Sequence, residues 1–302
     1  MARHSIRIFP VALFLLALIL TGKLTAHSDS STPHSGQRAN PGVFDAAYRS
    51  KTSTHKVIVQ ATESALRDSI IADGGSVLED YGAFVLMKAP ESSAERVSVE
   101  STSGSSVRDD MNAVLLRAGP FDTLEGEPLF ANSLGEADAA SEQLYIVQFI
   151  GPVKKHWVSE LKSVAEIVSY IPNNAYLVRA NREGLASIKG LAAQGSFVQW
   201  SGAFKPSYKI APEISLDSDQ ETTVTVQLAS ADAAGDVQEI VARSSASVVG
   251  TPTNTLSYTN VRLRLHSRLI PDVARMSNVL WIEPWSEPVL HDEKQGLIIA
   301  GR

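Results

Sequence analysis

LYIVQFIGPVKKHWVSELKSVAEIVSYIPNNAYLVRANREGLASIKGLAAQGSFVQWSGAF, residues Leu144–Phe204, is the stretch from which the fold can be predicted. Residues 144–150 are short, apolar and β-branched, which predicts a buried strand that ends at Gly151-Pro152. The apolar residues that follow recur every three or four positions and predict a helix with one buried face: Val153, Trp157, Leu161 and Val164. Strands are then predicted at 166–171 and 175–180, around a turn that contains two asparagines.

The second half of this stretch predicts one more helix and one more strand. Asn181 is suited to cap a helix whose apolar stripe is Leu185, Ile188 and Leu191, and Gly195 is suited to end it. Residues 196–200 then predict the fourth strand. The order β-α-β-β-α-β is the ferredoxin-like arrangement, in which two helices cover one face of a mostly antiparallel sheet. We expect the other face of the sheet to be free to dock a partner.

The same order of elements is predicted, more weakly, before and after this stretch, over residues 56–110 and 221–285. The dipeptides Val59-Gln60, Val147-Gln148 and Val226-Gln227 fall at the same place in the first strand of each unit. A period of roughly 80 residues is typical of a repeat protein. The sequence therefore predicts an α+β fold of three tandem ferredoxin-like βαββαβ modules.

The N-terminus has the features of a secretory signal peptide. Arg3 and Arg7 precede an apolar run over residues 11–20, and cleavage is predicted after Ala26. An uncleaved membrane anchor is the alternative, although the run is short for a span of about 20 residues. We expect a secreted or periplasmic protein with no membrane span after signal cleavage.

The rest of the chain divides by composition. We predict a flexible linker over 27–55, a first unit with an extension over 56–128, and a second linker over 129–142. The second and third units follow over 143–214 and 215–290, and the tail over 291–302 completes the chain. In the first linker, His27, His34 and His55 are spaced too irregularly for a metal site, so we expect solvated histidines. There is no cysteine, so stability must come from packing.

The charge of the chain argues against nucleic acid as a partner. The whole chain carries −6, and residues 1–26 hold three basic residues and no acid, so removing them leaves −9, three lower. No basic run accompanies this acidic balance, whereas nucleic-acid-binding proteins carry clustered Lys and Arg.

Several long phrases of the sequence resemble one family. They are LYIVQFIGPVKKHWVSELK, IVSYIPNNAYLVRA, FVQWSGAFKPSYKIAPEI, RDDMNAVLLRAGPFDT at Arg108–Thr123, and VLWIEPW at Val279–Trp285. Together they resemble the region upstream of the catalytic domain in large secreted bacterial subtilisin-like serine peptidases, from about Lys56 to the C-terminus. The units are similar to the subtilisin propeptide, or peptidase-inhibitor, domain. This resemblance implies a module that helps a protease to fold and then occupies its cleft. Three units in a row depart from the single domain of simple family members.

The chain itself is predicted to be non-catalytic. None of its seven histidines precedes a glycine, as the catalytic histidine of a subtilase would, and Gly250-Thr251 is followed by Pro252 rather than by a serine. No phosphate-binding glycine loop is present. We therefore expect no catalytic, cofactor-binding or metal-binding residues, and the resemblance implies a subtilisin-like catalytic domain as the partner, in cis or in trans.

The residues expected at a protease interface lie at the C-terminus. They are Trp285, Pro288, Leu290, Ile298 and Ile299. An extended, proline-bearing segment after a last strand can add to the edge of a partner's sheet, as a propeptide tail does in a protease cleft. The segment 206–214 has the same character after the second unit, and a plain linker is its alternative.

Two other functions remain open from the sequence. The chain could be the front part of a subtilase precursor, a serine endopeptidase whose catalytic domain would follow Arg302. It could also be an extracellular interaction scaffold that has reused the module, since a fold does not fix a function.

Overall fold

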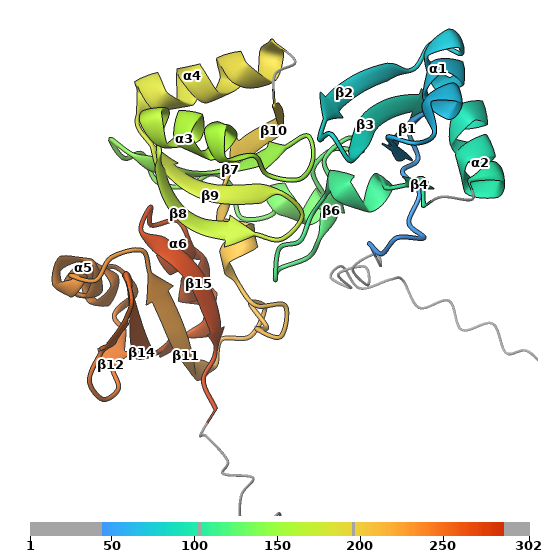
Figure 1. Ribbon diagram of the computed structural model, residues 1–302. Coiled ribbons are helices and arrows are strands. Elements are labelled where there is room, and N and C mark those ends of the chain that lie inside the picture. Colours follow the sequence, from blue (N-terminus) through green and yellow to red (C-terminus); the bar gives the residue numbers. More distant parts are fainter. Residues whose placement is uncertain (1–43, 102–103, 195–196, 287–302) are drawn as a thin grey trace, which may run out of the picture. The chain divides into compact units, whose positions relative to one another are not determined.

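The computed structural model describes residues 44–101, 104–194 and 197–286, and these residues form an α+β fold with antiparallel sheets (Figure 1). Three αβ segments follow one another along the chain. A connecting segment, residues 108–142, lies between the first and the second.

The first αβ segment has the predicted order of elements. Its strands form a sheet of order β2-β3-β1-β4, in which β1 pairs with both β3 and β4. The last strand is short, and a 3₁₀ helix begins soon after it at Asp109. The elements are β1 (Thr54–Gln60), α1 (Ser64–Ala72), β2 (Ser76–Asp80), β3 (Phe84–Pro90), α2 (Glu91–Glu100) and β4 (Ser106–Val107).

The second αβ segment agrees closely with the sequence prediction. Its sheet has the order β10-β7-β9-β8. Asn173 and Asn174 both have positive φ in the turn, and the Asn181 side chain caps α4 by accepting a hydrogen bond from the Gly184 amide at 2.8 Å. Gly195 lies outside the described residues. The elements are β7 (Gln143–Phe149), α3 (Lys155–Val164), β8 (Glu166–Ile171), β9 (Ala175–Ala180), α4 (Arg182–Ala193) and β10 (Val198–Ala203).

The third αβ segment has one strand more than expected. Two short strands, β12 and β13, stand where the module has its second strand, and both pair with β14. The sheet has the order β12-β14-β11-β15, so that β15 lies at an edge. The elements are β11 (Glu221–Leu228), α5 (Ala234–Ser244), β12 (Ser247–Val248), β13 (Thr253–Thr255), β14 (Tyr258–His266), α6 (Ile270–Ala274) and β15 (Val279–Pro284).

The second sheet is covered on both faces, which corrects the expectation of a free face. Its Val147 side packs on α3 and α4 around Trp157. Its Ile146 side packs on the connecting segment, whose short hairpin of β5 (Ala113–Val114) and β6 (Phe121–Asp122) supplies apolar side chains to the same core. The extension that was assigned to the first unit therefore packs on the second sheet.

The segment after the second sheet is not a free linker. Pro206–Lys209 form a buried 3₁₀ helix, and the Ala211 amide donates to the Ile282 carbonyl at 2.8 Å. Ile210 pairs with Ile282 in a parallel bridge at the edge strand β15. The segment that was considered as a strand for a partner's edge thus pairs with the third sheet of its own chain.

Lys209 gives this packing a measurable pH dependence. The side chain is 1% exposed, its Nζ donates to the Met276 carbonyl at 2.8 Å, and burial lowers its pKa to about 7. Since the unfolded chain holds this proton up to about pH 10.5, the stability that Lys209 provides rises with pH across the window from about 7 to 10.5. We expect Lys209→Met to remove this rise.

The effect of Lys209→Met is measured by urea unfolding of both proteins. The stability of the variant relative to wild type should fall by on the order of 3 kcal/mol between about pH 6 and pH 10. Lys189→Met on the exposed surface of α4 is the control and should show no such trend. If the difference in unfolding free energy between Lys209→Met and wild type did not change with pH, the side chain of Lys209 would not be buried as described.

Candidate functional site

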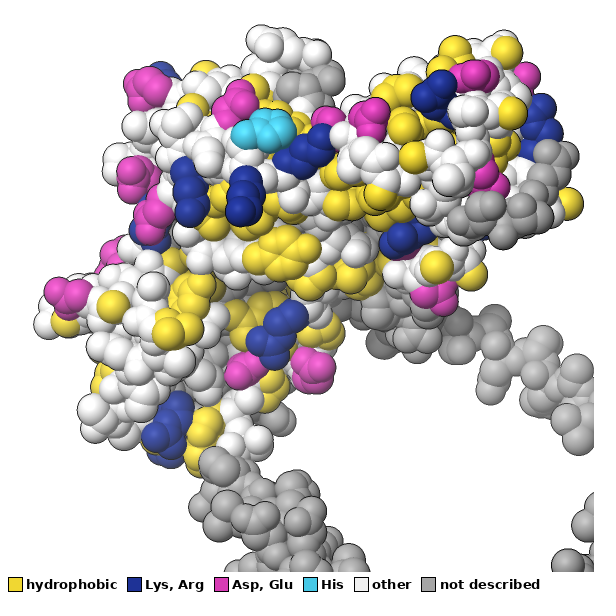
Figure 2. All heavy atoms as spheres, viewed as in Figure 1, with side chains coloured by type: hydrophobic (Ala, Val, Ile, Leu, Met, Phe, Trp, Pro, Cys, Tyr) yellow, Lys and Arg dark blue, Asp and Glu magenta, His cyan; other side chains and the backbone are white. Residues whose placement is uncertain are grey.

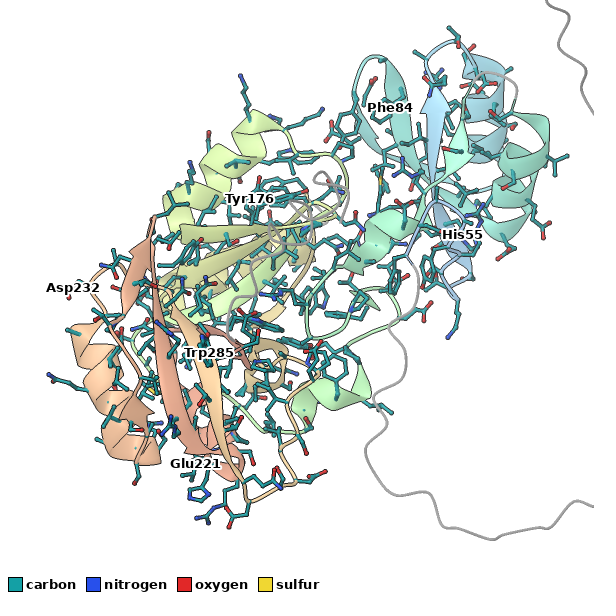
Figure 3. The ribbon with its side chains drawn as sticks, turned by 90° about the horizontal axis from the view of Figure 1, so that it is seen from below. His55, Phe84, Tyr176, Glu221, Asp232 and Trp285 are labelled. Carbon is teal, nitrogen blue, oxygen red and sulfur yellow. The ribbon has the colours of Figure 1, made fainter. Side chains whose placement is uncertain are left out.

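Of the residues predicted at a protease interface, Trp285 is the one that the structure describes. Pro288, Leu290, Ile298 and Ile299 lie outside the described residues. The Trp285 amide donates to the Thr223 carbonyl at 3.0 Å, which continues the pairing of β15 with β11 by one residue. The guanidinium carbon of Arg262 lies 5.5 Å from the centre of the ring of Trp285, which is labelled in Figure 3. Trp285 is therefore held at the end of the edge strand and is only partly buried.

Trp285 and two arginines share the face of the third sheet that lies opposite the helices. Along β14, Val261, Leu263 and Leu265 point into the helix-covered core, so the intervening Arg262 and Arg264 point to the other face. The register places Arg262 beside Thr225, and Arg264 beside Thr223. We call Thr223, Thr225, Arg262, Arg264 and Trp285 the open face.

The open face carries two arginines and shares its side of the sheet with Glu221 and Glu283. Among the described residues, no acidic side chain forms an ion pair with Arg262 or Arg264. Arg and Trp are the residues most enriched at interaction hot spots. The alternation of Val, Arg, Leu, Arg, Leu and His over residues 261–266 is a two-residue period that would have located this face from the sequence.

The neighbouring half of the same face is covered by the connecting segment. Arg117 Nη2 donates to Glu283 Oε2 at 2.8 Å, and Trp281 Nε1 donates to the same oxygen at 2.9 Å. The Arg117 guanidinium carbon lies 4.5 Å from the centre of the Trp281 ring. These contacts leave the open face as the part of the sheet that can meet a partner.

His55 is buried in the first αβ segment, which corrects its assignment as a solvated linker residue. It lies in β1 and is 3% exposed (Figure 3). Its Nδ1 lies 2.6 Å from Asp109 Oδ2, and its Nε2 lies 2.7 Å from Glu91 Oε2. Asp109 also accepts the backbone amides of Ser50 and Lys56, so residues before β1 belong to this packing. No spacing in the sequence indicated that these residues would meet.

The surroundings of His55 stabilise its protonated ring and do not suit it to transfer a proton. Burial alone lowers the pKa of His55, but the hydrogen bonds to Asp109 and Glu91 outweigh it, and the pKa is raised. A catalytic base needs one ring nitrogen free to take a proton from a nucleophile. Both ring nitrogens of His55 face carboxylates, those of Asp109 and Glu91. The His55–Asp109 distance is therefore like that of a catalytic dyad, but no ring nitrogen is left to accept a proton from a nucleophile.

The neighbouring Lys56 is also buried, and its Nζ reaches the Met111 carbonyl at 3.4 Å. Burial lowers its pKa to about 7, although the nearby carboxylates of Asp122, Asp109 and Asp110 oppose that shift. The cluster ties β1 to the start of the connecting segment. We interpret it as a structural group of charges.

No group of three or more possible ligands is placed to hold a metal ion within residues 44–101, 104–194 and 197–286. On the face shown in Figure 2, lysine and arginine side chains are scattered among acidic ones and do not form a continuous basic band. None of the described helices combines the length and the apolar character needed to cross a bilayer.

Comparison with known proteins gives one match. The model of a domain of unknown function, DUF8729, matches residues 115–205. This range joins part of the connecting segment to the whole second αβ segment, the two parts that share a core in the structure. No match was found among curated proteins.

Proposed function

We propose that this chain is an exported, non-catalytic array of three ferredoxin-like, propeptide-like modules that docks on the catalytic domain of a subtilisin-like serine protease. Two observations support the modules. The order of elements recurs in all three αβ segments, with one extra short strand in the third, and in each sheet the first strand lies between the next-to-last and the last strand of its unit. The resemblance of the sequence to subtilase propeptide regions supports the partner.

The observation that carries the proposal is the open face of the third sheet. Arg262, Arg264 and Trp285 lie together there without acidic partners among the described residues. A docked propeptide buries one sheet face on the protease and directs the chain after its last strand towards the cleft. In this chain, β15 is that strand, and it lies at the edge of the sheet beside the open face.

The other two sheets are less suited to this role. The helix-free face of the second sheet is covered by the connecting segment and by Leu280. On the first sheet, Ile58 and Leu86 of the helix-free face pack with Met111 of the connecting segment. We therefore assign protease docking to the third module and a supporting role to the first two.

Charge reversal on the open face tests this assignment. We expect Arg262→Glu combined with Arg264→Glu to weaken binding to a subtilisin-like catalytic domain by about tenfold or more, because two unpaired cations would become anions at the interface. Binding is measured by surface plasmon resonance at two salt concentrations. The control, Lys155→Glu with Lys189→Glu, carries the same charge change on exposed positions of α3 and α4. Equal binding by both double variants would contradict docking through the open face.

A further inference from the structure

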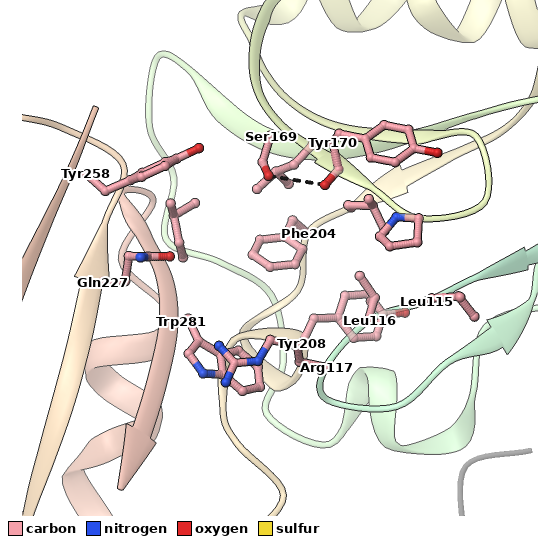
Figure 4. Close-up of a pocket in the computed structure, with 14 residues that line it drawn as sticks. Leu115, Leu116, Arg117, Ser169, Tyr170, Phe204, Tyr208, Gln227, Tyr258 and Trp281 are labelled. Atoms are coloured by element: carbon pink, nitrogen blue, oxygen red, sulfur yellow. Dashed lines mark hydrogen bonds between the residues drawn. The ribbon is translucent and has the colours of Figure 1, made fainter. Parts of the chain in front are cut away.

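An aromatic cavity lies where the connecting segment meets the second and third αβ segments. Its volume is about 300 Å³. Figure 4 shows Tyr258, Gln227 and Trp281 of the third segment on one side and Leu115 and Leu116 of the connecting segment on the other. Ligand sites in proteins occupy about 300–1,000 Å³, so this volume suits one or two side chains or a small ligand.

The lining is mostly apolar and aromatic, with Arg117, Ser169 and Gln227 as its polar members. Aromatic rings and leucine side chains make up most of the wall, and Phe204, Tyr208 and Leu280 are buried in it. Arg117 is the one charged residue among the described residues of the lining, and its side chain is 69% exposed. Only one of its five N–H donors has a described hydrogen-bond partner, Glu283. The cavity therefore offers an apolar interior with donors for an anionic group.

One wall of the cavity is the edge of a sheet. Ser169, Tyr170 and Ile171 line it, and they form the end of β8, which is the edge strand of the second sheet. The register of β8 against β9 shifts between Ile167 and Ser169, which separates this end from the rest of the strand. Tyr170 is 53% exposed, although large aromatic side chains are usually buried. An edge strand presents unpaired backbone groups to which another strand can add.

We propose that this cavity binds an extended acidic peptide, which adds to the end of β8, places one large apolar side chain in the cavity and pairs a carboxylate with Arg117. Main-chain pairing with a pocket for alternate side chains is a general mode of peptide recognition. The site is separate from the open face, and the proposal does not rest on a protease partner.

An extended peptide fits the observations better than a free small molecule. A small ligand would use the apolar wall and Arg117, but it would not pair with the edge of β8 or cover the exposed Tyr170. At this edge, Tyr258 Oη donates to the Val168 carbonyl at 2.7 Å and Ser169 Oγ to the Tyr170 carbonyl at 3.3 Å, and an added strand would replace these contacts. Arg117 favours an acidic peptide, since it is the one charged residue of the described lining and its ion pair with Glu283 uses only one of its donors. The expected ligand is therefore a peptide with an acidic residue close to an aromatic or leucine residue.

The probes are fluorescein-labelled peptides of about eight residues, rich in threonine and valine, with one central tryptophan followed by a glutamate. In matched peptides, alanine replaces the tryptophan, or lysine replaces the glutamate. Binding to the whole exported chain is followed by fluorescence anisotropy. N-acetyltryptophanamide serves as a competitor that lacks the peptide backbone.

We expect the tryptophan peptide to bind at least about tenfold more tightly than the alanine peptide, because it buries a large apolar side chain. Arg117→Glu should weaken binding of the glutamate peptide and strengthen binding of the lysine peptide, each by about fivefold. Gln227→Trp, which narrows the cavity without changing its charge, should weaken the binding of both peptides. Arg268→Glu on the exposed surface is the matched control and should change neither.

Three results would overturn the proposal: no binding of the tryptophan peptide, equal binding of the alanine peptide, or equal effects of Arg117→Glu and Arg268→Glu. Competition by N-acetyltryptophanamide at the concentration of the peptide itself would show a small-molecule site and overturn the role of β8. Circular dichroism shows whether each variant is folded. If Arg117→Glu is unfolded, Arg117→Gln should still weaken the glutamate peptide alone, and an unchanged affinity of that variant would overturn the role of Arg117.

Discussion

His55→Ala should cost the first αβ segment about 3–5 kcal/mol of stability, since it removes one partner from a buried charged group. Asp109 is fully buried, and its Oδ2 lies 2.6 Å from Nδ1 of His55. Without the ring, the carboxylate keeps only two backbone amide donors, those of Ser50 and Lys56. Urea unfolding, together with hydrogen exchange of the amides of β1 and β3, measures the loss and locates it.

The effect of His55→Ala should also depend on pH. The folded-state pKa of His55 is raised above its ordinary value of about 6.5, so its stabilising contribution is complete below that pH and is lost as the pH rises through the folded-state pKa. The difference between wild type and variant should therefore shrink as the medium becomes alkaline.

His156→Ala is the control for this prediction, because His156 is exposed on α3. It should change stability by less than about 0.5 kcal/mol at every pH. If His55→Ala were equally mild, the buried arrangement of His55, Asp109 and Glu91 would be wrong.

Trp157→Ala should destabilise the second αβ segment by about 3–5 kcal/mol, the usual cost of removing a buried tryptophan. Trp157 is 2% exposed and stacks on Phe197 with the ring centres 5.6 Å apart and an angle of 10°. Its ring also meets the edge of Phe149 at 5.8 Å and that of Tyr81, in the first αβ segment, at 6.4 Å. The cavity left behind would lie between α3 and the sheet.

Differential scanning calorimetry gives the stability loss of Trp157→Ala. Tyr170→Ala removes an aromatic ring that is 53% exposed, so it should cost about 1 kcal/mol or less. A similar loss for both variants would contradict the core position of Trp157. Because Tyr81 contacts Trp157, we also expect faster hydrogen exchange at the end of β2 in the Trp157 variant.

The second αβ segment was predictable because its signals are local. Strands 166–171 and 175–180, the asparagine turn and the Asn181 cap each depend on residues within a few positions of one another. Trp157 could be assigned to the core from helical spacing alone. The third segment was harder to predict, since β12 and β13 are short and exposed and carry little apolar periodicity.

What the sequence did not reveal depends on contacts between distant residues. His55 meets Asp109 across 54 positions, and Ile210 pairs with Ile282 across a still longer separation. The connecting segment covers the second sheet through residues that showed no strong pattern of their own. Burial of His55 and Lys56 also could not be predicted from their residue types. Charged groups are buried only when other groups compensate them, and those groups lie far away in the sequence.

The candidate site could be predicted only in part. Trp285 was expected at an interface, but Arg262 and Arg264 were passed over, although their alternation with Val261 and Leu263 was readable. The aromatic cavity was not predictable, because its lining comes from three separate parts of the chain.

The most direct test of the central claim is a calorimetric titration of the chain from residue 27 onwards with a bacterial subtilisin-like catalytic domain whose nucleophilic serine is replaced by alanine. Our account predicts a one-to-one complex with a Kd below about 1 μM, weakened when both Arg262 and Arg264 are changed to Glu. No heat of binding at about 100 μM, from protein shown to be folded, would contradict it.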